Sequence, residues 1–317
     1  MCFIKTVKYS GECPLLCRAG CVVALGLFDG VHIAHRALIS EARKRADELG
    51  LPLAVFTFPS ESPSLKGGRG RLYSTEERLS LLEELSVDVT VLCDFDSIRD
   101  TSPEDFADLV LVRHLGARLA VFGYNFTYGK GGVGNAVSLK ERLAHFGVGS
   151  FVLDEKRYFG EEISTTRIKG LLDALDLMGA ARLLGKAYFI TGTVVKGRGD
   201  GKGLGIPTVN LDLKDDLYAL PHGVYATAVV IDGVPYLSMT NIGTCPTFGA
   251  RQPHAECCIL GYDGDLYGEK MYVYFIKRLR DEMHFDNADK LIMQINIDKN
   301  EVLSLESEKL WQELGLK

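Results

Sequence analysis

The sequence predicts an α/β domain built on a parallel sheet, followed by an all-β antiparallel Greek-key barrel with a C-terminal helix. The chain has 317 residues, which is too long for one ordinary hydrophobic core and suits two domains. Apolar strands alternate with amphipathic helices in the first part, whereas short strands separated by Gly, Pro and Asp turns follow after about residue 186. We therefore predict domains at residues 1–186 and 187–317.

The first part alternates regularly between strands and helices. Two of its helices have predicted N-terminal caps: Ser74 with Glu77 has the spacing of a capping box, and Ser102 precedes Pro103. Apolar strands joined by helices are typical of a parallel sheet that is covered on both faces. The predicted order is strand 22–25, helix from about 32 to 46, strand 53–58, helix 74–85, strand 87–92, helix 103–115, strand 119–122 and helix 172–184.

The second part has strand-length segments at regular spacing and no predicted helix before its end. Regularly spaced short strands predict a compact antiparallel barrel, which the terminal helix would close. The predicted strands are residues 188–195, 223–231, 236–242, 255–260 and 270–275, and the predicted helix is 288–314.

Composition restricts the classes of function. The net charge of −6 argues against a general nucleic-acid-binding protein, which would normally have a basic surface. No apolar run approaches the roughly 20 residues that a membrane-spanning helix needs. Charged residues interrupt any secretory signal near the N-terminus. We therefore expect a cytoplasmic protein with small-molecule partners, no membrane or nucleic-acid partner, and reduced cysteines. The sequence does not specify an oligomeric state.

The first chemical motif lies where the first strand gives way to the first helix. In GLFDGVHIAH (residues 26–35), His32 and His35 are three residues apart and share one face of the first helical turn. A helix N-terminus attracts phosphate, and two imidazoles beside it can stabilise the charge on a leaving pyrophosphate. Alone, the pair is more typical of a capped surface helix. The strand–turn–helix position favours a phosphate site.

A second group of candidate phosphate ligands is ISTTRI, residues 163–168. Ser164, Thr165 and Thr166 stand at a predicted helix start, and Arg167 adds a cation with a forked set of donors. Together they are suited to hold triphosphate oxygens. Without partner motifs, an ordinary N-cap with a surface arginine would be the preferred interpretation.

Residues 192–211 are the most informative stretch of the chain. Glycines at alternate positions from 197 to 205 allow the backbone to approach a ligand with its N–H groups turned inward. The stretch is neither a Walker A loop nor a Rossmann GxGxxG loop. In the PTVN tail, Thr208 and Asn210 lie on the same side of an extended chain and offer hard oxygen ligands that suit Mg²⁺. In isolation, both are also ordinary polar residues of a strand.

The motifs of the first part resemble those of a known family. GLFDGVHIAH is similar to the GxFDGVHxGH signature of the nucleotidyltransferase domain in bacterial bifunctional riboflavin kinase/FMN adenylyltransferases. VFGYNFTYGK (residues 121–130) and ISTTRI look like further segments of that family. The resemblance implies a Rossmann-like domain that transfers the adenylyl group of ATP to FMN, with His32 and His35 catalytic and Asn125 at the flavin. The implied ATP- or phosphate-binding residues are Gly26, Phe28, Asp29, Gly30, Ser164, Thr165 and Arg167.

The second part resembles the riboflavin kinases of the same family. The similar segments are GKGLGIPTVNL (residues 201–211), NIGTCPTF (241–248), DGDLYG (263–268) and the stretch around Arg280. The resemblance implies transfer of the γ-phosphate of ATP to riboflavin, with Glu256 as general base and Arg280 on the flavin side. Thr208 and Asn210 would hold Mg²⁺. The implied phosphate-binding residues are Gly197, Gly201, Lys202 and Gly205.

Three functions remain open on the sequence. Ala34 stands where the family usually has Gly, and residues 58–63 lack the His of its PHP-like turn. These departures leave open a riboflavin kinase with a weakened or silent adenylyltransferase domain, beside the bifunctional enzyme. The third hypothesis is a non-enzymatic flavin or nucleotide sensor. Retention of Glu256, Thr208 and Asn210 counts against a sensor, because binding alone needs no base.

Overall fold

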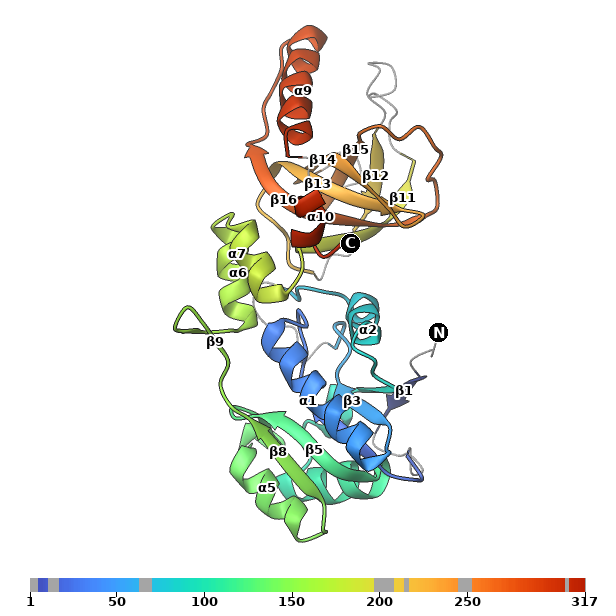
Figure 1. The fold of residues 1–317 in the computed structure, drawn as a ribbon, viewed down its shortest axis with the longest axis vertical. Coiled ribbons are helices and arrows are strands. Elements are labelled where there is room, and N and C mark those ends of the chain that lie inside the picture. The colour runs from blue at the N-terminus through green and yellow to red at the C-terminus, as the bar shows by residue number, and fades with distance from the viewer. Residues whose placement is uncertain are drawn as a thin grey trace. The chain divides into compact units, whose positions relative to one another are not determined.

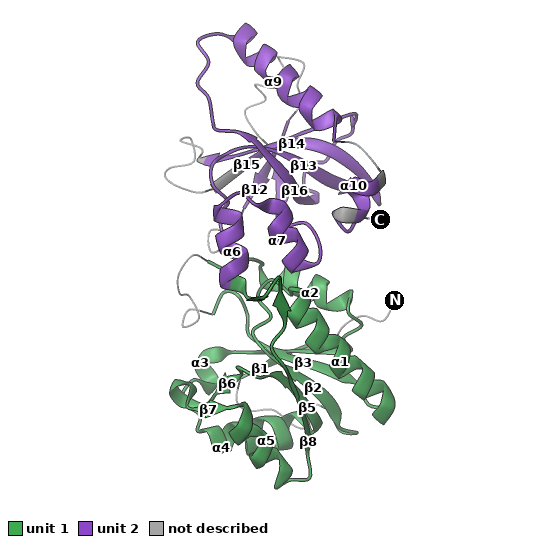
Figure 2. Cartoon of the chain, turned by 60° about the vertical axis from the view of Figure 1, so that its left-hand side comes forward, with its two compact units in different colours: residues 1–165 green, residues 166–317 purple. Residues whose placement is uncertain are grey.

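The chain folds into two compact units, residues 1–165 and 166–317 (Figure 2). The computed structural model describes residues 5–10, 17–62, 70–196, 208–213, 217–244, 253–305 and 308–316. A parallel sheet forms the first unit and a closed antiparallel barrel the second, so the predicted fold class is confirmed. Within the described ranges, no helix combines the length and the apolar character needed to cross a membrane.

Every adjacent pair of strands in the six-stranded sheet of the first unit is parallel. The chain runs from β2 through β3 to β4 on one side, and from β5 to β8 on the other. The strand order therefore reverses between β2 and β5, and open parallel sheets bind ligands at the carboxyl ends of their strands at such a switch point. In spatial order the strands are β1 (Lys5–Tyr9), β4 (Val89–Cys93), β3 (Leu53–Thr57), β2 (Cys21–Leu25), β5 (Ala117–Gly123) and β8 (Gly149–Leu153).

Helices cover both faces of this sheet (Figure 1). One face packs against α1 (Ile33–Leu49), which contacts β2, β3 and β5. The other face shares a hydrophobic core with η2 (Phe106–Leu115), a π-helix, and with α5 (Ala136–Ala144). Because both faces are covered, β2 and β3 are buried along their whole length, which explains their continuous apolar sequences.

Side-chain caps begin two of the helices as the sequence predicts. The capping box of α2 (Thr75–Glu83) is formed by both of its hydrogen bonds, Glu77 N–H to Ser74 Oγ at 3.2 Å and Ser74 N–H to Glu77 Oε2 at 2.6 Å. Ser102 accepts a hydrogen bond at 3.0 Å from the N–H of Asp105. α1 ends at Gly50, whose φ of 63° is the left-handed conformation that glycine adopts readily.

Three predicted helices differ from the structure. The predicted helix 103–115 is a short α4 (Pro103–Asp105) that continues as the wider π-helix η2. The predicted helix 172–184 is interrupted at Leu175, whose φ of 62° is incompatible with a right-handed helix; its two parts are α6 (Thr165–Asp173) and α7 (Leu177–Leu184).

The predicted terminal helix 288–314 is also two helices, α9 (Ala288–Leu303) and α10 (Glu308–Glu313). Near the end of α9, the Ser304 hydroxyl donates to the Glu301 carbonyl, which competes with continuation of the helix. The remaining short elements are α3 (Phe95–Ile98), β6 (Thr127–Tyr128), η3 (Lys130–Gly132), β7 (Gly134–Asn135), β9 (Arg157–Tyr158) and β10 (Glu161–Glu162).

The barrel of the second unit closes in the order β11-β12-β15-β14-β13-β16, with antiparallel pairs throughout. β13, β14 and β15 are consecutive neighbours, and β16 returns beside β13, which is the Greek-key arrangement that the sequence predicts. α9 packs on β14. The strands are β11 (Phe189–Val195), β12 (Val209–Asp212), β13 (Gly223–Ile231), β14 (Val234–Thr244), β15 (Pro253–Ile259) and β16 (Lys270–Arg280).

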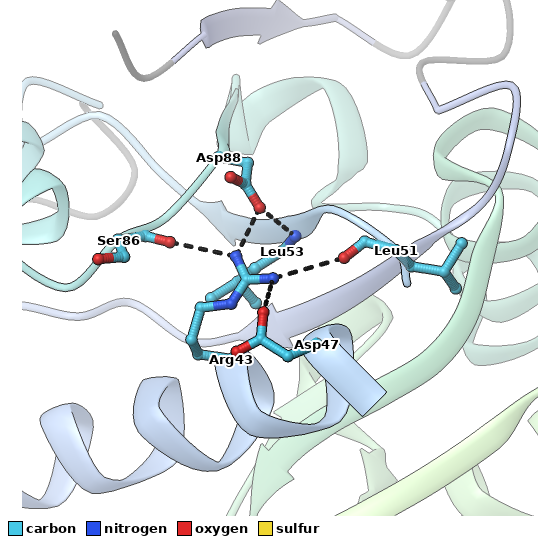
Figure 3. A network of polar contacts seen from close by, with 6 residues as sticks. All are labelled: Arg43, Asp47, Leu51, Leu53, Ser86 and Asp88. Carbon is cyan, nitrogen blue, oxygen red and sulfur yellow. Dashed lines mark hydrogen bonds and ion pairs between the residues drawn. The ribbon is translucent and has the colours of Figure 1, made fainter. Parts of the chain in front are cut away.

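A cluster of hydrogen bonds and ion pairs around Arg43 connects α1 to the amino-terminal edge of the parallel sheet (Figure 3). Arg43 of α1 contacts Asp88 Oδ2 at 2.6 Å, Asp47 Oδ1 at 2.7 Å and two backbone carbonyls. Asp88 Oδ2 also accepts the N–H of Leu53 at 2.7 Å, so one carboxylate joins the helix to the starts of β3 and β4. This cluster lies at the edge of the sheet away from the switch point.

Removing the Arg43 guanidinium should destabilise the fold without touching either candidate site. We expect Arg43→Met to lower the free energy of unfolding by about 1–3 kcal/mol, because Asp88 and the carbonyls lose a charged donor. Chemical denaturation followed by circular dichroism measures this change. The matched control is Arg99→Met, whose side chain is 55% exposed and should change stability by less than about 0.5 kcal/mol. Equal effects of both variants would contradict the role of the cluster.

Candidate functional site

A cleft of about 520 Å³ opens at the carboxyl ends of β2, β5 and β8 in the first unit. It therefore lies at the switch point of the sheet, where the sequence motif predicts a phosphate site. Seven of the predicted site residues line it: Gly26, Phe28, His32, His35, Asn125, Ser164 and Thr165. Arg167 lies in the first turn of α6, in the second compact unit.

The turn between β2 and α1 has an unusual backbone. Phe28, Gly30 and Val31 have φ angles of 52°, 84° and 42°, and only glycine adopts this region without strain. Strain of this kind costs about 1–3 kcal/mol per residue and is concentrated at functional sites. A Cβ atom on Gly26 would lie 2.9 Å from the Phe28 ring, so the ring leaves no room for a side chain there. The close approach of these two residues shapes one wall of the cleft.

Asp29 contacts the protein rather than lining the cleft. Its Oδ1 accepts the N–H of Leu72 at 3.0 Å, and its carbonyl accepts the Thr165 hydroxyl at 3.1 Å. Asp29 is buried, and Gly30 beside it does not line the cleft in the described part of the chain. The contacts of Asp29 therefore join the turn to the segment before α2 and to the first residue of α6, while other residues of the turn line the cleft.

The two histidines form a stacked pair at the start of α1. Their ring centroids are 3.6 Å apart with an interplanar angle of 12°, and His32 Nδ1 accepts the N–H of His35 at 3.3 Å. Burial lowers the pKa of His32 to about 4, and burial together with the neighbouring His32 and Arg78 lowers the pKa of His35 well below its usual value. Both rings are therefore neutral near pH 7. Because Nδ1 of His32 is the N-cap acceptor, its proton lies on Nε2.

The buried neutral histidines should make stability depend on pH. The unfolded chain binds a proton at His32 below about pH 6.5, whereas the folded protein does so only below about pH 4. The contribution is therefore complete above pH 6.5 and is lost as the pH falls. We expect the free energy of unfolding to fall by about 2 kcal/mol between pH 7.5 and pH 5 from His32 alone. Denaturation at both pH values measures this, and His32→Asn, which keeps a capping oxygen, should reduce the difference.

Asn125 belongs to a polar cluster in the cleft wall that follows β5. The Tyr124 hydroxyl donates to Glu162 Oε1 at 2.8 Å, and Asn125 Nδ2 reaches the same oxygen at 3.5 Å. The three residues come from the end of β5 and from β10, and all three line the cleft. Tyr124 and Glu162 were not among the predicted site residues.

A second cavity, of about 320 Å³, lies in the second unit between α9 and one face of the barrel strands. Residues of alternating position on β14 and β15 face it, because side chains two apart lie on the same side of a strand. Apolar and acidic side chains dominate the lining. It consists of Thr208, Val224, Met239, Asn241, Glu256, Cys258, Arg280, Glu282, Met283, Phe285, Leu291, Ile295 and Asp298.

Glu256 lies at the centre of a polar group in this cavity. In the sheet it is paired with Asn210 of β12 on one side and with Asn241 of β14 on the other. The Thr208 hydroxyl donates to Glu256 Oε1 at 2.6 Å. Hydroxyl, amide and carboxylate oxygens are therefore brought together by strand pairing, although they are far apart in the sequence.

Arg280 is held by α9. Its Nε and Nη2 both lie 2.9 Å from Asp298 Oδ2, and Gln294 donates to Asp298 Oδ1 at 2.8 Å. Asp298 is only 3% exposed, so this carboxylate is paired in a dry environment where charge-assisted hydrogen bonds are strong. Asp298 was not predicted, because its pairing with the end of β16 depends on how α9 packs.

Part of the predicted kinase site lies outside the described residues. Gly197, Gly201, Lys202 and Gly205 are in this group, as are residues 245–248 of the NIGTCPTF segment. In the described portion of the chain, no group of three or more His, Cys, Asp or Glu side chains could hold a metal ion. The oxygens of Thr208, Asn210 and Glu256 fit Mg²⁺, which takes hard oxygen ligands and usually keeps waters and substrate phosphates in its shell.

Both halves of the chain match known protein families. The family model for FAD synthetase matches residues 16–167, and the model for riboflavin kinase matches residues 184–305. The bifunctional riboflavin kinase/FMN adenylyltransferase of Bacillus subtilis is 33% identical, over 90% of this chain and 92% of its own length. That of Escherichia coli is 32% identical, over 94% of this chain and 96% of its own.

A solved structure agrees over nearly the whole chain. The crystal structure of a protein described as a macrolide-efflux protein from Streptococcus pneumoniae matches with a TM-score of 0.83 and 29% identity, covering 96% of this chain and all of that one. The FAD synthetase model matches the part of the chain that contains the first cleft, and the riboflavin kinase model matches the part that contains the second cavity. The chain therefore belongs to the bifunctional riboflavin kinase/FMN adenylyltransferase family.

Proposed function

We propose that the chain makes FAD in two steps, phosphorylating riboflavin in its C-terminal part and adenylylating the resulting FMN in its N-terminal part. The observation that carries the proposal is the position of Glu256 in the barrel cavity. Its carboxylate lies 2.6 Å from the Thr208 hydroxyl, and in the ladder of β12 and β15 Glu256 stands opposite Asn210. A potential base therefore lies beside the oxygens that suit a metal-bound triphosphate.

In the kinase step, Glu256 accepts the proton of the ribityl 5′-hydroxyl as that oxygen bonds to the γ-phosphorus of ATP. The bond from the γ-phosphorus to the bridging oxygen breaks, and ADP leaves. Thr208 and Asn210 would hold Mg²⁺, which neutralises phosphate charge when bound. The Asp298–Arg280 pair fixes a cation in the wall of the same cavity, and we propose that it faces the flavin.

In the adenylyl step, a phosphate oxygen of FMN bonds to the α-phosphorus of ATP, and pyrophosphate leaves. The attacking phosphate is already an anion, so no general base is required. His32 and His35 are neutral at the start of α1 and act as hydrogen-bond donors toward phosphate oxygens, where the helix N-terminus also favours negative charge. Asn125, Ser164 and Thr165 complete the cleft wall.

The departure at Ala34 does not close this cleft. Ala34 lines it, and with this methyl group present the whole cleft has a volume of about 520 Å³. This space supports an active adenylyltransferase over a silent one. We also propose that the boundary between the catalytic domains lies near residue 186, after α7, because the riboflavin kinase model begins only at residue 184, where α7 ends.

One incubation tests the proposal and its alternatives. The purified protein is mixed with riboflavin, ATP and Mg²⁺, and FMN and FAD are separated and quantified. We expect both products, with FMN appearing first. FMN without FAD, also when FMN is supplied, would identify a riboflavin kinase with a silent N-terminal domain. The absence of both products would favour a non-enzymatic sensor.

A further inference from the structure

Arg78 is a buried arginine directly behind the adenylyltransferase cleft. It lies on α2 and is only 3% exposed. Its Nη1 donates to the Leu27 carbonyl at 2.8 Å, and its Nη2 donates to the Phe58 carbonyl at 2.6 Å. Nη1 also lies 3.3 Å from Thr57 Oγ1, which itself donates to the Leu27 carbonyl at 2.8 Å. Arg78 does not line the cleft, but Leu27 and Phe58 do.

The Arg78 guanidinium connects two segments of the cleft wall, one that follows β2 and one that follows β3. Leu27 follows β2 and immediately precedes Phe28, the first residue of the turn with positive φ angles. Phe58 follows β3. A planar guanidinium that donates to both carbonyls fixes their separation and orientation, which a single point donor cannot do. The strained turn that carries His32 is therefore held from behind.

The charge of Arg78 is also unusual for such a buried position. Burial lowers its pKa to about 10, and the neighbouring Asp29 opposes this change, so the group is a cation at neutral pH. The oxygens that its guanidinium contacts in the hydrogen bonds above carry only partial charges. Its positive charge lies close to the cleft, because the two carbonyls that it contacts belong to residues that line the cleft. After burial and His32, Arg78 is a further cause of the lowered pKa of His35. A buried cation has a large desolvation cost, which a nearby anionic ligand would offset.

We propose that Arg78 is a positioning residue of the adenylyltransferase site, which sets the two cleft walls and presents a fixed positive charge to the triphosphate of ATP. This inference rests on the proposed function of the N-terminal domain. It predicts two separable contributions. The positive charge should strengthen the binding of ATP, and the hydrogen bonds to the two carbonyls should raise the reaction rate of the bound complex.

Two substitutions separate these contributions. Arg78→Met removes both the positive charge and the hydrogen bonds to the two carbonyls. It should raise KM for ATP at least tenfold and lower kcat for FAD formation from supplied FMN about 10²-fold. Arg78→Lys keeps the positive charge, but the single ammonium group of lysine cannot donate to both carbonyls in the way the forked guanidinium does. It should restore KM for ATP to within about threefold of the wild type while kcat stays at least tenfold low. Riboflavin phosphorylation by the same chain is the internal reference and should not change.

Arg43→Met is the matched control for a lost arginine in the same domain. It removes a guanidinium at the other edge of the sheet, where none of its hydrogen bonds or ion pairs involves a cleft residue. It should lower stability while leaving KM for ATP and kcat unchanged. If Arg78→Met and Arg78→Lys have wild-type constants, or share one raised KM, the inference is overturned. If the wild-type protein forms no FAD from FMN, the proposed function itself fails.

Discussion

Replacing Glu256 with glutamine should lower the rate of FMN formation by about 10²- to 10⁴-fold, the range that a general base typically contributes. Glutamine has nearly the same shape and keeps an oxygen within reach of Thr208, but it cannot take the proton of the ribityl hydroxyl. Adenylylation of supplied FMN should be unchanged, because the N-terminal cleft is a separate site. Steady-state kinetics of both reactions on one preparation measure the two effects.

The matched control for this substitution is Glu282→Gln. Glu282 lies on the wall of the same cavity, where Asn241 Nδ2 is 3.4 Å from its Oε1, but it is not paired with Thr208. We expect less than a tenfold loss of kinase activity in this variant. Equal losses in Glu256→Gln and Glu282→Gln would show that cavity charge, rather than a base at position 256, determines the rate.

Replacing His32 with asparagine should lower the rate of FAD formation from FMN by about 10²- to 10³-fold, as removal of one preorganised donor typically does. Asparagine is among the best N-cap residues, so the side-chain oxygen can still accept the N–H of His35. The helix start is kept and the Nε2–H donor is lost. His32→Ala should lose the donor and also about 1 kcal/mol of stability from the cap.

A comparison of these two variants separates catalysis from folding. Both should form FMN from riboflavin at the wild-type rate, since the kinase cavity is in the other unit. If His32→Asn retains full adenylyltransferase activity while His32→Ala loses it, the role of His32 is only to cap α1.

Most of the fold could be predicted from the sequence, and the two strands of the parallel sheet that were missed share one physical reason. β1 and β8 are the two edge strands of the parallel sheet. The continuous apolar run that identifies a central strand is absent there: β1 includes two lysines, and β8 is only half-buried or exposed. Leu175, whose positive φ divides α6 from α7, has no sequence signature, because leucine is a good helix former.

The candidate sites could be predicted only where a motif is contiguous. His32 and His35 are on one helical turn, so their spacing alone brings them together. The proximity of Thr208 and Glu256 depends on the pairing of β12 with β15, which the sequence does not specify without a family resemblance. Arg78 and Asp298 were missed because each is an ordinary charged residue on a helix, and only tertiary packing gives it a buried partner.

The pairing of β15 has a consequence for how this part of the chain can change. Glu256 and Cys258 face the cavity, whereas Cys257 between them is fully buried on the other side of the strand. Inserting one residue before Glu256 would turn the carboxylate toward the barrel core and move the Cys257 thiol to the cavity side of the strand. Inserting two would restore the side but displace the acid by about 7 Å along the strand. A substitution in β15 therefore changes one side chain, whereas an insertion or deletion that shifts the register moves the Glu256 carboxylate away from its position beside Thr208.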